Sequence, residues 1–156
     1  EEEVPNLIKN SVQLSFIGDL SQFEEELITQ MKNSEKLTYC DPSEKKLDLV
    51  VAASYGGRWD IVNAANKIHE KNLNFPITEE HFNSLLSTAP FGDPDLCIRT
   101  GNELRVSNFL LWQLAYSELY FPDILWPDFD DNQFELALSE YSKRVRRFGD
   151  KSNFQI

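Results

Sequence analysis

Cysteine, histidine and methionine are scarce in this chain of 156 residues, which holds two cysteines, two histidines and one methionine. Cys40 and Cys97 are too few for a disulfide framework, and neither stands in the spacing of a zinc site. His69 and His81 belong to no catalytic motif, so we expect both at the surface. The shortage excludes a disulfide-rich secreted fold and favours reduced thiols in a cytoplasmic protein.

Positive charge is also in short supply. Fifteen Lys and Arg residues oppose 26 Asp and Glu residues, which gives a net charge of −11 and an isoelectric point near 4.6. Nucleic acids and anionic membranes both need a basic face, so the composition disfavours both as partners. An anionic ligand would therefore have to be bound by a local cluster of arginines.

Long apolar runs are missing as well. No stretch reaches the roughly 18 apolar residues of a membrane span, and the acidic start, Glu1–Glu3, is unlike a signal peptide. Hydrophobic residues nevertheless make up 41% of the chain and aromatic residues 12%, which excludes a disordered protein. The length suits one domain with a real core.

Strand and helix patterns alternate along the chain. The predicted strands are 12–17, 47–54 (covered on both faces), 95–99 and 118–121, and the predicted helices are 21–37, 58–70, a short one from 78, 107–116 and 132–147. This alternation predicts an α/β fold with a mostly parallel central sheet flanked by helices. Ligands bind such sheets at the carboxyl ends of the strands, here Tyr55–Arg58 and Arg99–Gly101.

Two arginines and a serine follow the third predicted strand. Arg99 ends the strand, Arg105 lies in the next loop, and Ser107 stands where a helix is expected to begin. A helix N-terminus and two guanidinium groups together would suit a diphosphate. The alternative is that both arginines are surface charges and Ser107 is only a helix cap.

Two acidic residues lie close to this stretch. Glu118 follows an apolar segment, and a carboxylate beside a diphosphate is a plausible Mg²⁺ ligand, although an exposed acid at a helix end is the simpler interpretation. Glu103 stands between the arginines and could orient one of them, contact a metal, or remain a solvated loop acid.

Three blocks carry a resemblance to a known family. They read IRTGNELRVSNFLLWQLAYSELYF followed by LWPDFD, VAASYGGRWDI from Val51, and FIGD from Phe16. In this order they resemble the cis-prenyltransferases, the family of undecaprenyl diphosphate synthase, over about residues 12–149. The resemblance implies a cis-prenyltransferase-like α/β fold and the condensation of isopentenyl diphosphate with an allylic diphosphate such as farnesyl diphosphate, usually with Mg²⁺. The product would be a long-chain polyprenyl diphosphate.

The resemblance also implies roles for individual residues. Arg99, Arg105, Val106 and Ser107 would bind isopentenyl diphosphate, and Glu118 would hold Mg²⁺ with Glu103 in support. Arg147 and Gly149 of a C-terminal Arg-x-Gly element would reach the neighbouring active site of a homodimer. The apolar segments 109–120 and 134–141 suggest the interface of that dimer. Leu47 and Leu49 would line the tunnel for the growing chain, although on their own they read as core. The expected location is cytoplasmic, peripheral to the inner membrane.

Several features depart from the family pattern. Asn102 replaces a common glycine, Leu104 a histidine that can join the metal shell, and Ser54 an asparagine. The N-terminal His-x-x-Asp-Gly-Asn-x-Arg-Trp block, which carries the catalytic aspartate, is absent. We therefore expect residues 1–156 to be the C-terminal part of one catalytic domain, inactive when isolated. A non-catalytic accessory subunit of a heteromeric enzyme is the alternative, followed by a generic phosphate-binding module.

Overall fold

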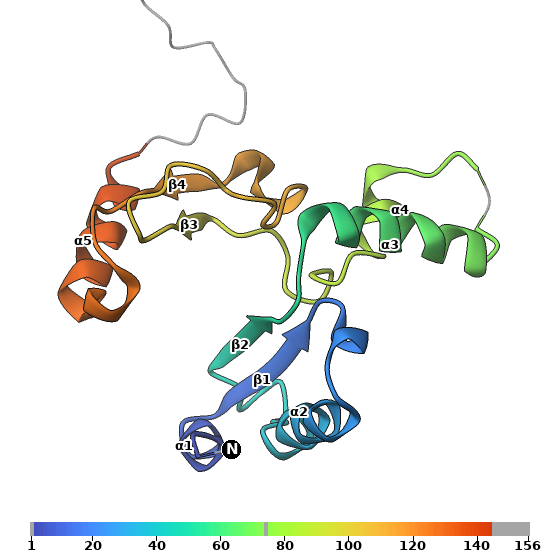
Figure 1. Ribbon diagram of the computed structural model, residues 1–156, viewed down its shortest axis with the longest axis horizontal. Coiled ribbons are helices and arrows are strands. Elements are labelled where there is room, and N and C mark those ends of the chain that lie inside the picture. The colour runs from blue at the N-terminus through green and yellow to red at the C-terminus, as the bar shows by residue number, and fades with distance from the viewer. Residues whose placement is uncertain (1, 74, 145–156) are drawn as a thin grey trace, which may run out of the picture. The chain divides into compact units, whose positions relative to one another are not determined.

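The computed structural model describes residues 2–73 and 75–144, and the chain divides into two compact units after Gly92. The elements follow one another in the order α1 (Val4–Lys9), β1 (Val12–Ile17), α2 (Glu25–Leu37), β2 (Leu47–Ala52), α3 (Gly57–Glu70), α4 (Glu79–Asn83), β3 (Leu96–Ile98), β4 (Glu118–Tyr120) and α5 (Asp131–Ser142). Figure 1 traces this order along the ribbon. Short 3₁₀ helices lie at Leu20–Gln22, Gln113–Tyr116 and Trp126–Asp128.

The first unit is built on a parallel pair of strands. β1 pairs with β2 in a register that sets Val12 opposite Leu47 and Leu14 opposite Leu49. Helix α2 makes the crossover between them, as a parallel pair requires. Figure 1 shows the two arrows side by side, with α1 and α2 close to them. The predicted α/β class is confirmed, with parallel strands and flanking helices.

The outer edge of β1 is closed by side chains rather than by another strand. The Leu14 amide donates to Thr38 Oγ1 at 3.1 Å, and the Phe16 amide donates to Glu35 Oε1 at 2.7 Å. Both acceptors come from the C-terminal end of α2, where the Thr38 side chain is 2% exposed. These bonds satisfy two strand amides that would otherwise be open.

Two sequence expectations for this unit are corrected. Residues 21–37 do not form one helix, because Asp19 caps the 3₁₀ turn at Leu20–Gln22 and α2 begins only at Glu25. The predicted burial of β2 on both faces is also wrong, because nothing among the described residues covers one of its two faces. Its alternate side chains Leu47, Leu49 and Val51 are therefore exposed.

Helix α3 is anchored through a buried acid. Asp60, in its first turn, is fully buried and accepts hydrogen bonds from Tyr55 Oη and from the Ser87 amide, both at 2.9 Å. Further along the helix, Lys67 Nζ donates to the Leu85 carbonyl at 2.8 Å. These bonds connect the loop after β2, α3 and the segment that follows α4.

The second unit contains the other parallel pair, β3 and β4, in which Leu96 lies opposite Glu118 and Ile98 opposite Tyr120. Helix α5 contacts β4, and Ala137 is its one fully buried residue. α5 begins at Asp131 with Asp130 as its cap and ends at Ser142, so the prediction of a helix to Arg147 is wrong from Lys143 onward in the described residues.

Candidate functional site

Two backbone hydrogen bonds fix the start of the loop that follows β3. The Arg99 amide donates to the Tyr120 carbonyl at 2.9 Å, and the Gly101 amide donates to the Ile124 carbonyl at 2.7 Å. Gly101 and Asn102 both have positive φ, of 85° and 56°, which suits a glycine and an asparagine. The loop after the strand is therefore held against the chain that follows β4.

Glu103, which lies between Arg99 and Arg105 in the sequence, forms an ion pair with Arg105. Glu103 Oε2 accepts from Arg105 Nη2 at 2.9 Å and from Nε at 3.2 Å. The hydrogen bond and the charge of Arg105, together with the charge of Arg99, lower the pKa of Glu103 below its ordinary value. Of the three roles predicted for Glu103, the structure shows the pairing with Arg105, whereas Arg99 acts on this carboxylate only through its charge.

A small cavity lies beside this cluster. It has a volume of about 260 Å³ and is lined by Cys97, Ile98, Arg99, Thr100, Val106 and Phe109. Burial raises the pKa of the Cys97 thiol, and the charge of Arg99 offsets part of that rise. Burial therefore disfavours the thiolate, which is the nucleophilic form of a cysteine.

Ser107 does not begin a helix, and this part of the prediction is wrong. Ser107, Asn108 and Leu110 have positive φ of 45°, 63° and 43°, which a right-handed helix cannot contain. The first helical turn after the loop is the 3₁₀ helix Gln113–Tyr116. The expected phosphate cradle of helix amides is thus not formed, and Ser107 lies on a turn next to Val106 of the cavity wall.

Glu118 is the first residue of β4 and does not lie at the end of a helix. Its Oε2 accepts from Arg144 Nη1 at 2.8 Å, and the same nitrogen donates to the Leu119 carbonyl at 2.9 Å. The Glu118 side chain is 26% exposed. Within the described residues, no three His, Cys, Asp or Glu side chains gather as a metal site.

The remaining predicted residues divide into two groups. Leu47 and Leu49 lie on the exposed stripe of β2, in the first unit. Arg147 and Gly149 lie outside the described residues. The sequence analysis did not single out Asp60, although an acidic residue in the first turn of a helix after Gly56–Gly57 could have indicated it. It also did not predict the contact between Arg144 and Glu118.

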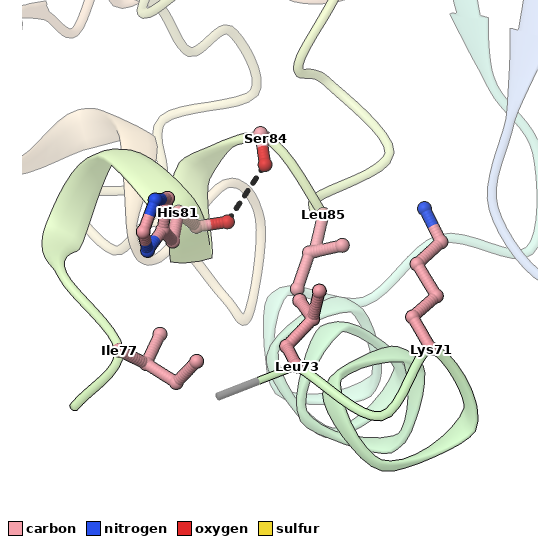
Figure 2. A pocket seen from close by; sticks show the side chains of 6 residues that line it. All are labelled: Lys71, Leu73, Ile77, His81, Ser84 and Leu85. Atoms are coloured by element: carbon pink, nitrogen blue, oxygen red, sulfur yellow. Dashed lines mark hydrogen bonds between the residues drawn. The ribbon is translucent and has the colours of Figure 1, made fainter. Parts of the chain in front are cut away.

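A second cavity, of about 350 Å³, lies between the end of α3 and α4 in the first unit. Figure 2 shows the six side chains that line it: Lys71, Leu73, Ile77, His81, Ser84 and Leu85. The only hydrogen bond drawn there runs from Ser84 Oγ to the His81 carbonyl, at 2.8 Å. None of the predicted site residues lines this cavity, and His81 is exposed as expected.

Comparison with known proteins gives a consistent result. A family model described as putative undecaprenyl diphosphate synthase matches residues 1–149. A ditrans,polycis-undecaprenyl-diphosphate synthase, (2E,6E)-farnesyl-diphosphate specific, from Yersinia pseudotuberculosis serotype I is 48% identical over 154 residues; the match covers 96% of this chain and 60% of that protein. The chain thus spans about three fifths of the length of this relative.

Two solved structures resemble the chain closely. A probable undecaprenyl diphosphate synthase from Campylobacter jejuni is 37% identical with a TM-score of 0.83, covering 96% of this chain and 68% of that one. Lavandulyl diphosphate synthase from Lavandula x intermedia, solved with dimethylallyl diphosphate, is 38% identical with a TM-score of 0.87, covering 95% of this chain and 65% of that one.

Proposed function

Because the chain belongs to the undecaprenyl diphosphate synthase family, we propose that it forms part of a transferase that condenses isopentenyl diphosphate with an allylic diphosphate. The allylic substrate would be farnesyl diphosphate and the product a long-chain polyprenyl diphosphate such as undecaprenyl diphosphate, as the name of the Yersinia relative suggests. Residues 1–156 would carry the half-site for isopentenyl diphosphate within one catalytic domain. We expect no turnover from these residues alone.

The cluster at the carboxyl end of β3 carries this proposal. In a chain of net charge −11, Arg99 and Arg105 both act on Glu103 beside a cavity that Arg99 and Val106 line. Guanidinium groups bind phosphate oxygens through charge-assisted hydrogen bonds. Arg105 is 78% exposed, so a dissolved anion can reach it while Glu103 keeps it oriented.

A magnesium ion that arrives with a diphosphate would find one carboxylate in this part of the chain, that of Glu118, whose Oε2 accepts a hydrogen bond from Arg144. Mg²⁺ commonly takes one or two carboxylates and completes its shell with phosphate oxygens and water, and Glu118 provides one carboxylate. When bound, the ion would neutralise diphosphate charge. A ligand set made wholly of protein side chains is not required for this role.

The arginines would act mainly by positioning. Binding of the diphosphate by Arg99 and Arg105, with Val106 and Ser107 alongside, would hold the double bond of the isopentenyl group toward the allylic carbon. In the reaction a carbon–carbon bond forms between the two, the allylic diphosphate leaves with its electron pair, and a proton is lost from the isopentenyl unit. Leu47 and Leu49 would contact the growing apolar product.

We further propose a homodimer with a place at the inner surface of the membrane, where its lipid product is used. Phe134 and Leu138, one helical turn apart on α5, are 48% and 44% exposed and provide an apolar surface for a second copy. Arg147 and Gly149 would complete the neighbouring site. Among residues 2–73 and 75–144, no helix is both long and apolar enough to cross a membrane.

Calorimetric titration of the 156-residue chain with isopentenyl diphosphate in magnesium buffer tests the half-site. A hydrogen bond to a charged group contributes about 1.5–3 kcal/mol, so Arg99→Ala should weaken binding about tenfold or more. Lys45→Ala is the control, because it removes one positive charge that is paired with Asp48 in the first unit. Equal affinities for wild type and Arg99→Ala would refute the assignment.

A further inference from the structure

The cavity of Figure 2, which we call the α3–α4 cavity, has an apolar floor. Leu73, Ile77 and Leu85 form this floor, and Leu85 is only 5% exposed. The volume of about 350 Å³ falls near the lower end of the range for pockets that bind small molecules, roughly 300–1,000 Å³. The cavity is therefore large enough for a small ligand with an apolar part.

Hydrogen bonds fix the walls of the α3–α4 cavity on both sides. On the side of α3, Lys67 Nζ donates to the Leu85 carbonyl at 2.8 Å, and the Leu73 amide donates to the Ile68 carbonyl at 3.1 Å. On the other side, the side chain of Thr78 caps α4. Because the site is already formed, a ligand that binds there loses little free energy in ordering it.

Two polar side chains of the cavity are available to a ligand. Neither the Lys71 ammonium nor the His81 imidazole takes part in a hydrogen bond or an ion pair among residues 2–73 and 75–144. Figure 2 shows these two groups on opposite sides of Leu73 and Leu85. The third polar side chain, that of Ser84, donates its hydroxyl to the His81 carbonyl at 2.8 Å and is thus already engaged.

The charge of the cavity is opposite to that of the chain as a whole. The six residues that line it include one lysine and no acidic residue, in a chain with 26 acidic residues and a net charge of −11. An ammonium group attracts an anion, and an apolar floor favours contact with a hydrocarbon. A ligand complementary to the cavity thus combines a negative head with a short apolar chain.

We propose that the α3–α4 cavity binds a small amphipathic anion, a short hydrocarbon chain with a phosphate or carboxylate head. The hydrocarbon would lie on Leu73, Ile77 and Leu85, and Lys71 would pair with the head. Prenyl phosphates and fatty acids both have this chemistry. The cavity belongs to the first unit and the Arg99 cluster to the second, so the proposal does not depend on the half-site for isopentenyl diphosphate.

Titration of the 156-residue chain with hexyl phosphate tests the site, because one of the two histidines of the chain lines the cavity. In NMR spectra the imidazole signals of His81 should shift to saturation, while those of His69, identified with His69→Gln, stay in place. Burial of a few CH₂ groups should make hexyl phosphate bind about tenfold or more tightly than inorganic phosphate. Lys71→Gln should weaken binding about two- to fivefold. The control Lys36→Gln removes the same charge from the surface of α2 and should leave binding unchanged.

The choice of probe separates the two ligand sources and the possible failures. Tighter binding of hexyl phosphate than of hexanoate would support a prenyl phosphate, and the reverse order would support a fatty acid. The proposal is overturned if hexanol binds as tightly as both anions, because the charge of Lys71 then has no role. It is also overturned if inorganic phosphate binds as tightly as hexyl phosphate, because the apolar floor then has none. Equal shifts of both histidines, or no shift of either, would refute the site.

Discussion

Replacement of Gly18 by alanine should strongly destabilise the first unit. Gly18 follows β1 with φ of 121°, and a Cβ atom there would lie 2.0 Å from the Ala53 carbonyl oxygen, whereas ordinary van der Waals contact begins at 3.4 Å. The neighbouring atom is backbone and cannot rotate away. The strand ends would have to separate.

The expected cost follows from the bonds that this separation breaks. The Asp19 amide donates to the Ser54 carbonyl at 3.2 Å, and the Ala53 amide donates to the Ile17 carbonyl at 2.8 Å. Each contributes about 0.5–1.5 kcal/mol, and the left-handed conformation costs a residue with a Cβ about 1–2 kcal/mol. We therefore expect Gly18→Ala to lower the free energy of unfolding by about 3 kcal/mol.

Gly92→Ala is the matched control in the same unit. Gly92 also has a positive φ, of 73°, but no atom lies within 4 Å of the Cβ that it would gain. It should lose only the conformational part, about 1 kcal/mol. Urea denaturation, followed by the fluorescence of Trp59 after Trp112→Phe and Trp126→Phe, reports on the first unit. If the two variants differ by less than about 0.5 kcal/mol, the steric argument is refuted.

Three further predictions concern the β1 edge, the arginine cluster and self-association. Thr38→Val leaves the Leu14 amide without its acceptor and should cost about 1–3 kcal/mol in urea denaturation. Because Arg105 lowers the pKa of Glu103, the ion pair stabilises the fold above the ordinary carboxyl pKa and loses this effect as pH falls through the lowered pKa. Arg105→Gln should move the pKa of Glu103 upward in an NMR titration. Phe134→Asp should weaken a homodimer in analytical ultracentrifugation, because it puts a charge on the exposed apolar surface of α5.

Each of these has a clear contrary result. Thr38→Ser keeps the hydroxyl acceptor, so a loss as large as that of Thr38→Val would contradict the role of the hydrogen bond. An unchanged Glu103 titration in Arg105→Gln would show that the pair does not persist in solution. Equal association of wild type and Phe134→Asp would exclude this part of α5 from the interface.

Much of the framework could be predicted from sequence because the relevant signals are local. Alternating side chains located β1 at its observed bounds, and the glycine pair before Arg58 together with helical periodicity located α3 within one residue. The same holds for α4, whose cap Thr78 accepts from the His81 amide. The strand and cap patterns express backbone preferences that need no distant partner.

The errors arise where non-local contacts decide. Residues 107–116 have helical periodicity, but Ser107, Asn108 and Leu110 have positive φ. The loop that leads to them is fixed to Ile124 at Gly101. The exposure of Leu49 depends on which elements pack on the face of β2, and no local pattern contains that information. Glu118 and Arg144 are 26 positions apart, so their contact had no sequence signal.

The closed edge of β1 has a consequence for self-association. Another strand can add there only after the hydrogen bonds from the Leu14 and Phe16 amides to Thr38 and Glu35 are broken, and it must then approach a carboxylate. Edge-to-edge stacking, the route by which exposed strands start to aggregate, is therefore blocked on this side of the sheet. The helix that connects the two strands thus also sets the direction in which the sheet can grow: across the edge of β2 that no strand covers within residues 2–73 and 75–144.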